Sequence, residues 1–122
     1  LDSFRPLVIA LSAGANFIAR AFSGDSGGAA EIIAQAIRHP GFSFVEVMSP
    51  CVTFRPEQKD WKQSVRRTGV PETGDPAQAA RRIMTDDGFN LGILYRGDRR
   101  PYRTDVDADT VDLSELEKDF EQ

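Results

Sequence analysis

The sequence predicts an α/β domain in which flanking helices cover a short parallel sheet. Three short apolar runs have the length and composition of strands, and they lie near residues 17–21, 44–48 and 91–95. Amphipathic segments at residues 29–38 and 76–87 separate these runs, and the first of them would be the crossover between the first two strands. Strands that alternate with helices in this way favour a parallel sheet with right-handed connections.

The composition is that of a globular domain. Of 122 residues, 40% are hydrophobic and 28% are charged, so we expect one domain with a core of its own. The single cysteine excludes an internal disulfide and a self-contained metal site with four ligands. No apolar run approaches the length of a membrane span, and the first residues lack the pattern of a signal peptide. We therefore expect a cytoplasmic protein, and a start at Leu1 fits a processed chain or a fragment.

The net charge of −4 combines a basic body with an acidic tail. Residues 1–103 carry 14 basic and 11 acidic side chains, a net of +3, whereas residues 104–122 carry one basic and eight acidic side chains, a net of −7. The arginine pairs of the body are scattered among acidic residues, which favours solvated faces over a nucleic-acid surface. We expect the tail to be disordered, or to form a short helix from about Asp112 that docks three apolar side chains, those of Leu113, Leu116 and Phe120.

A short helix is predicted at residues 6–13. Pro6 lies near its start and Gly14 follows its end, which is the usual placement of these residue types around a helix. Ser3 is available upstream as a cap. Because the segment is apolar all round, a buried strand is the alternative.

The segment at residues 29–38 is the clearest helix of the chain. Its apolar side chains recur at helical spacing and form one stripe, made of Ala29, Ile32, Ile33, Ala36 and Ile37. Asp25 or Ser26 can cap its first turn, and Arg38 lies in its last turn. The glycine-rich turn before it matches neither the dinucleotide fingerprint nor the P-loop, so a tight capped turn is favoured over a phosphate site.

The second half of the chain is more polar. A helix is predicted at residues 57–67, with Trp61 and Val65 as its apolar anchors. Asp75 as cap and Pro76 at the first position begin the next helix, which Gly88 ends. Its apolar stripe consists of Ala80, Ile83 and Met84.

Two polar residues of the first half have predicted partners. His39 follows Arg38 at a helix end, where its imidazole can meet the last carbonyls of the helix. Glu46 lies in the middle of a predicted strand, and an unpaired buried carboxylate is costly. It therefore either faces an open sheet edge or pairs with an arginine such as Arg20.

Cys51 is the candidate site residue. Pro50 ends the strand at residues 44–48, and Cys51 follows at once. In α/β sheets, ligands and reactive groups gather just beyond the carboxyl ends of strands. By itself a lone cysteine is more often a buried, inert thiol. A cysteine hydrolase is the least favoured reading, because no base can be identified.

Several motifs carry a family resemblance through their order and spacing. They are Ala13-Gly14-Ala15-Asn16-Phe17-Ile18-Ala19-Arg20, Phe22-Ser23-Gly24-Asp25, His39-Pro40-Gly41-Phe42 and Ser49-Pro50-Cys51-Val52-Thr53-Phe54. Together they resemble the C-terminal half of the β subunit of 2-oxoacid:ferredoxin oxidoreductases, most closely the 2-oxoglutarate branch. Trp61, the Asp75-Pro76 helix and the run Leu91-Gly92-Ile93-Leu94-Tyr95 are similar to the C-terminal extension of that family.

The resemblance implies an oxidative decarboxylation of a 2-oxoacid to an acyl-CoA. It implies thiamine diphosphate with magnesium as cofactors, and a [4Fe–4S] cluster that passes electrons to ferredoxin. Cys51 matches the fourth cysteine ligand of the cluster in the family. The other three ligands and the Gly-Asp-Gly motif for magnesium and diphosphate are absent from this sequence, so the chain by itself would be inactive and bind none of these cofactors.

The resemblance also implies a division of the chain and a set of partners. Residues 1–55 would be the last part of a thiamine-diphosphate-binding domain, residues 56–103 the β-subunit extension, and residues 104–122 a partly disordered acidic tail. The partners would be the N-terminal half of the β subunit, the α subunit, ferredoxin and coenzyme A, with neither nucleic acid nor membrane. An apolar sheet edge left by the missing half would favour an oligomer. The alternative is a non-catalytic interaction module that retains the half-fold.

Overall fold

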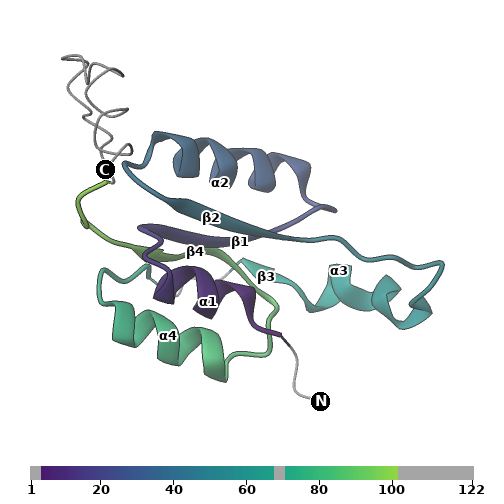
Figure 1. The fold of residues 1–122 in the computed structure, drawn as a ribbon. Coiled ribbons are helices and arrows are strands. Elements are labelled where there is room, and N and C mark those ends of the chain that lie inside the picture. Colours follow the sequence, from purple (N-terminus) through teal and green to yellow (C-terminus); the bar gives the residue numbers. More distant parts are fainter. Residues whose placement is uncertain (1–3, 68–70, 102–122) are drawn as a thin grey trace, which may run out of the picture.

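A computed structural model describes residues 4–67 and 71–101 of the chain. Four strands form one open sheet in the order β2-β1-β4-β3, with β1 (Phe17–Phe22) and β4 (Asn90–Arg96) in the middle. The outer strands are β2 (Ser43–Met48) and the two-residue β3 (Arg66–Arg67). The helix α2 (Ser26–Arg38) covers one face of the sheet, while α1 (Pro6–Ser12) and α4 (Pro76–Thr85) cover the other (Figure 1).

The first half of the chain forms the predicted parallel unit. β1 is buried along its whole length and pairs in parallel with β2, in a register that places Arg20 beside Glu46. The helix α2 is the crossover between the two strands. Its N-terminal cap is Asp25, whose carboxylate accepts a hydrogen bond of 3.1 Å from the Gly28 amide. The α/β class, the parallel β1–β2 pair and the crossover helix are therefore confirmed.

The direction predicted for the third strand is wrong, because β4 runs antiparallel to β1. After β2 the chain stays at the same end of the sheet, through the short 3₁₀ helix η1 (Pro56–Asp60) and α3 (Trp61–Ser64), and then starts β3. β3 therefore runs back, and α4 connects it to a parallel β4. The polar pair Arg66-Arg67 carries no strand signal in the sequence, so this second crossover was not predicted.

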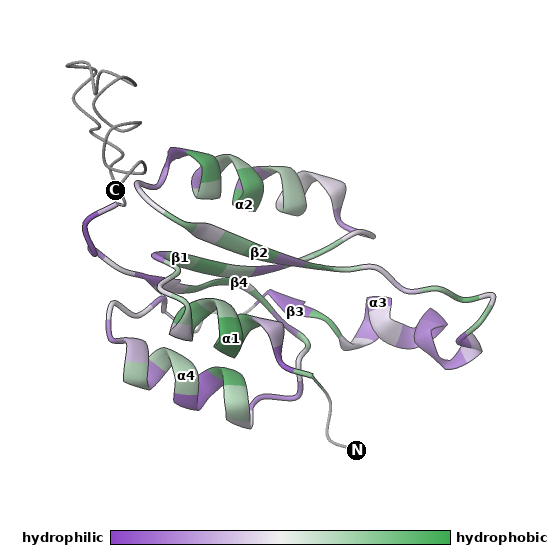
Figure 2. Ribbon diagram, viewed as in Figure 1, coloured by the Kyte–Doolittle hydropathy of each residue, from purple (hydrophilic) through white to green (hydrophobic). Residues whose placement is uncertain are grey.

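The helix predicted over residues 57–67 is also wrong in extent. The chain forms η1, then a single turn of α3, and it is extended again at Val65. Trp61 does act as an anchor, since its ring packs edge-on against Phe89 with centroids 5.8 Å apart. Figure 2 shows that this region is mostly hydrophilic, in contrast to β1 and β2. A segment with so little apolar surface gains little by extending a helix.

Two apolar clusters hold the layers together. One lies under α1 and α4 and consists of Leu7, Ala10, Leu11, Ala15, Ile18, Ala79, Ile83 and Tyr95. The other lies under α2 and is built on Phe17, Ala19 and Ala36, with Ile32, Val45 and Ile93 packed against it. An irregularity in the β1–β4 register leaves Leu94 without a partner on β1. Leu94 consequently packs with Tyr95 on the α1–α4 side, as expected at a β-bulge.

The predictions for the ends of α1 and for His39 are confirmed only in part. The predicted α1 begins after Arg5, which makes no side-chain cap, and Ser3 lies outside the described residues. Gly14 follows α1 with φ of 96°, a conformation that favours glycine. The His39 imidazole does not reach the carbonyls of α2, because it lies 3.0 Å from the carbonyl oxygen of Gly97 and packs against the ring of Phe17.

The predictions for the acidic tail lie outside the described residues. Within the part of the chain that the structure describes, every helix is too short or too polar to cross a membrane.

Candidate functional site

Cys51 lies in an exposed loop immediately after β2. β1 and β2 are parallel, so their carboxyl ends meet at the same end of the sheet, and the loop leaves from that end (Figure 1). The Cys51 amide donates to Oε1 of Gln58 at 2.8 Å, and the Cys51 carbonyl accepts from the Arg55 amide at 2.8 Å. These two bonds fix the backbone of the loop while the thiol is free and exposed. The inert-thiol interpretation required burial, which the structure does not show.

Two exposed apolar side chains follow Cys51 in the same loop. Phe54 exposes 85% of its surface and Val52 exposes 53%. Large apolar side chains this exposed and this close together usually mark a contact surface. Among the described residues, no group of three or more His, Cys, Asp or Glu side chains could hold a metal ion. This part of the chain therefore offers one accessible thiol and no complete metal site.

A buried charge cluster lies on the opposite side of β2 from α2. Arg20 of β1 is 5% exposed; its Nε donates to Oε2 of Glu46 at 2.7 Å and its Nη1 to Oδ2 of Asp86 at 2.9 Å. The same Nη1 lies 3.3 Å from the carbonyl oxygen of Asn90. The predicted Arg20–Glu46 pair is confirmed, and Glu46 also lies on an outer strand of the sheet. Because both carboxylates are engaged by the guanidinium, the cluster ties β1, β2 and the end of α4 together.

Asp86 was missed by the sequence analysis. It lies 66 positions from Arg20, in the residues that follow α4. The only signal in the sequence that could have indicated Asp86 was its place close to Gly88. The chain has to turn back toward the sheet in that segment. Asp86 also accepts from the Gly88 amide at 3.1 Å, so one side chain closes the turn and meets the buried arginine.

The turn before α2 is occupied by side chains. Asp25 accepts from Nε of Arg67 at 2.9 Å, pairs with Nη2 of the same arginine and caps α2 through the Gly28 amide. The Arg67 hydrogen bond and then the Gly28 amide lower the pKa of Asp25. A carboxylate already sits where a phosphate would have to bind. The prediction of a tight capped turn is therefore confirmed.

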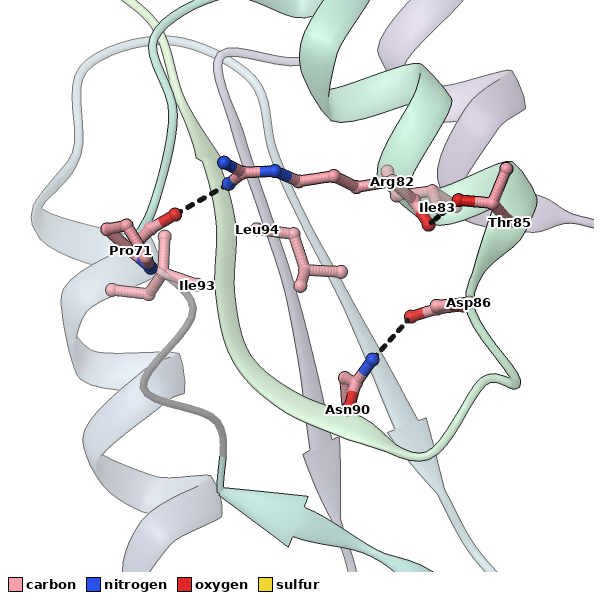
Figure 3. Close-up of a pocket in the computed structure, with 8 residues that line it drawn as sticks. All are labelled: Pro71, Arg82, Ile83, Thr85, Asp86, Asn90, Ile93 and Leu94. Atoms are coloured by element: carbon pink, nitrogen blue, oxygen red, sulfur yellow. Dashed lines mark hydrogen bonds between the residues drawn. The ribbon is translucent and has the colours of Figure 1, made fainter.

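A hollow beside β4 is lined by eight residues (Figure 3). It lies between α4, β4 and Pro71, with an apolar floor made of Ile83, Ile93 and Leu94. Its polar groups are already engaged: Nη1 of Arg82 donates to the Pro71 carbonyl at 2.7 Å, and Nδ2 of Asn90 lies 3.4 Å from Oδ2 of Asp86. The hollow contains no nucleophile and no free acid–base pair, so we assign it no chemistry.

Asn16 holds the other end of β1. Its side-chain amide donates to the carbonyls of Pro40 and Arg99 at 2.9 and 3.0 Å, and its Oδ1 accepts from the Arg99 amide at 2.9 Å. Asn16 is 3% exposed, and its bonds to Pro40 and Arg99 are part-buried. It joins the segment after β4 to the turn before β2, and it is a structural residue rather than a reactive one.

The fold and the site together define the class of protein. It is a partial α/β domain in which an accessible cysteine follows β2, the second strand of the parallel pair. No family model matches the chain. It is similar to curated β subunits of 2-oxoacid:ferredoxin oxidoreductases. The Saccharolobus solfataricus subunit is 31% identical over 105 residues, which cover 82% of this chain and 34% of that subunit. A subunit from Aeropyrum pernix is 28% identical over 109 residues, which cover 77% of this chain and 35% of the relative.

A solved structure gives the same result. It is a 2-oxoglutarate:ferredoxin oxidoreductase from Magnetococcus marinus with 2-oxoglutarate, coenzyme A and succinyl-CoA bound. It matches 99% of this chain and 40% of its own, with a TM-score of 0.72 and 25% sequence identity. The resemblance predicted from the motifs is confirmed: this chain is a homologue of part of the β subunit of 2-oxoacid:ferredoxin oxidoreductases. It spans about a third of the length of these curated relatives.

Proposed function

We propose that this chain is the C-terminal part of a β subunit in which Cys51 is one of the four thiolate ligands of a [4Fe–4S] cluster. The observation that carries the proposal is the free, exposed thiol of Cys51 in a fixed loop just beyond β2. Cluster ligation needs thiolates that converge from several segments, and an exposed thiol at a strand end suits that requirement. The similarity to β subunits of ferredoxin oxidoreductases supports the same assignment.

The complete subunit would act in the oxidative decarboxylation of a 2-oxoacid, with 2-oxoglutarate as the proposed substrate. The Magnetococcus enzyme with bound 2-oxoglutarate, and a 33% identical 2-oxoglutarate oxidoreductase subunit of Mycobacterium tuberculosis, support this substrate. Thiamine diphosphate would supply the carbanion chemistry, coenzyme A would take the acyl group, and ferredoxin would accept electrons from the cluster. The α subunit would complete the assembly.

The described residues could supply one ligand of the cluster, and they lack the groups that would bind the other cofactors. They contain no group of three or more metal-ligating side chains, and the turn before α2 is filled by Asp25 and Arg67. We therefore assign magnesium, diphosphate and the other cluster ligands to the part of the subunit outside this chain. Residues 1–55 would complete the thiamine-diphosphate-binding domain, residues 56–103 would form an extension, and residues 104–122 an acidic tail. The 122-residue chain alone would be inactive.

The test uses the full-length β subunit expressed together with its α subunit. Cys51→Ser is compared with the wild type and with Thr53→Ser. The Thr53→Ser control changes the same loop and leaves the thiol in place. We expect Cys51→Ser to lose cluster iron and most of the reduction of a viologen dye by 2-oxoglutarate. Thiamine diphosphate binding should survive in this variant, and Thr53→Ser should match the wild type.

Wild-type iron content and dye reduction in Cys51→Ser would overturn the assignment of Cys51. The sequence encoded upstream of Leu1 separates the enzyme from a non-catalytic interaction module. The enzyme requires a Cys-x-x-Cys pair and a Gly-Asp-Gly motif there, and the module requires neither.

A further inference from the structure

The loop that follows β2 is shaped by hydrogen bonds more than by packing. After β2 the chain runs out beyond the end of the sheet before it returns through α3 (Figure 1). The side chains of Val52 and Phe54 are 53% and 85% exposed, so apolar contacts contribute little to the shape of the loop. Its conformation depends instead on bonds that join Cys51, Arg55 and Gln58.

Three hydrogen bonds close this loop on itself. The Arg55 amide donates to the Cys51 carbonyl at 2.8 Å, and the Gln58 amide donates to the Arg55 carbonyl at 2.9 Å. Pro56 follows Arg55 at the start of η1 and has a fixed φ, which stiffens the backbone between these bonds. The third bond uses a side chain, because the Cys51 amide donates to Oε1 of Gln58 at 2.8 Å. Gln58 therefore holds the cysteine end of the loop.

Gln58 differs from the residues around it. Residues 51–57, 59 and 60 are all exposed, whereas Gln58 is partly buried. The neighbouring Glu57 pairs with Arg55 on the surface, where both side chains are more than half exposed. Gln58 turns inward in an exposed polar segment, and its carbonyl oxygen accepts the amide of the candidate cluster ligand. Solvation of a polar surface does not require that placement.

The Cys51 amide is relevant to an iron–sulfur cluster. The reduction potential of a cluster depends on the hydrogen bonds that N–H groups donate to its sulfur atoms. Such donors stabilise the reduced cluster, which is more negative, and so they raise the potential. An amide that already donates to a glutamine oxygen has less to donate to sulfur. A cluster that passes electrons to a ferredoxin needs a low potential, so withholding a donor suits that role.

We propose that Gln58 is a positioning residue for the cluster. It fixes the backbone of Cys51 and takes up the amide that would otherwise be free to donate to a cluster sulfur, which keeps the reduction potential low. This inference rests on the proposed function, because it requires that Cys51 is a cluster ligand. Gln58 acts only through the Cys51 amide, so its side chain is not itself a ligand.

The test uses two variants of Gln58 in the full-length β subunit expressed with its α subunit. Gln58→Leu removes the acceptor, and Gln58→Glu keeps an oxygen acceptor and adds a negative charge. Gln63→Leu is the matched control, because Gln63 is an exposed glutamine on α3. The midpoint potential of the cluster is measured by redox titration with electron paramagnetic resonance. Exchange of the Cys51 amide is measured by hydrogen–deuterium exchange in the iron-free protein.

We expect Gln58→Leu to shift the midpoint potential to a more positive value and to speed exchange of the Cys51 amide. Gln58→Glu should retain iron and slow exchange, with a potential at or below that of the wild type. Gln63→Leu should match the wild type in both measurements. If Gln58→Leu loses its iron, retention of iron by Gln58→Glu supports the proposal, because the acceptor is what the two variants do not share.

Two results would overturn the proposal. One is a wild-type potential in an iron-loaded Gln58→Leu, and the other is loss of iron from Gln58→Glu. Both Gln58 variants leave the Cys51 thiol in place, whereas Cys51→Ser removes it. The cluster assignment and the role of Gln58 can therefore fail separately.

Discussion

Replacement of the buried arginine should reveal how much of the stability depends on the charge cluster. Arg20→Met keeps the length and the apolar stem of the side chain but removes the guanidinium from two carboxylates. The side chains of Arg20, Glu46 and Asp86 are 6%, 26% and 13% exposed. Removal of one partner from a buried ion pair costs about 3–5 kcal/mol, because the other charge is left without compensation. Glu46 retains some access to water, so we expect a loss of about 3 kcal/mol from the free energy of unfolding.

The measurement is urea unfolding followed by circular dichroism, with Arg66→Met as the matched control. Arg66 pairs with Asp87, but both side chains are about half exposed, so its removal should leave the unfolding midpoint unchanged. Glu46→Gln added to Arg20→Met should recover part of the loss, because a neutral amide is less costly to leave unpaired than a carboxylate. A loss below about 1 kcal/mol for Arg20→Met, which is typical of exposed pairs, would refute the reasoning.

Three further predictions concern other polar residues. Asn16→Ala should lower the free energy of unfolding by about 1–3 kcal/mol, because it removes three part-buried hydrogen bonds between a buried side chain and the backbone of Pro40 and Arg99. Calorimetry would check this, and an unchanged Tm would contradict it. Asp75→Ala should cost about 1 kcal/mol through the lost cap of α4, while Asp75→Asn should cost little, as chemical denaturation can show. Asp25 has a lowered pKa in the folded protein. Its contribution to the free energy of unfolding should therefore be fully present above its ordinary pKa and should be lost as the pH falls through the lowered value. Asp25→Asn should flatten the acid limb of a stability–pH curve, and an unaltered limb would contradict the Arg67 pairing.

The helices and the central strands could be predicted because their signals are local. The Asp25 and Asp75 caps and the apolar run of β1 each need only neighbouring residues, and the structure confirms them. The predicted stripe of α2 is confirmed only in part, because Ile32 and Ala36 pack on the sheet whereas Ile33 and Ile37 are exposed. The position of Cys51 beyond a strand was equally local. Its motif also carried the family resemblance, which the similarity to curated β subunits then confirmed.

Only the tertiary structure decided the strand directions and the long-range polar contacts. β4 is antiparallel to β1 because the two residues of β3, which carry no apolar signal, reverse the chain before the second crossover. Asp86 reaches Arg20, and the His39 ring reaches Gly97, across 66 and 58 positions of sequence. Hydrophobic periodicity records which face of an element is buried, whereas a hydrogen bond between distant residues depends on how the elements are placed. The sequence therefore determined most of the helices and strands and the candidate cysteine, and packing determined β3, the strand directions and the contacts around the site.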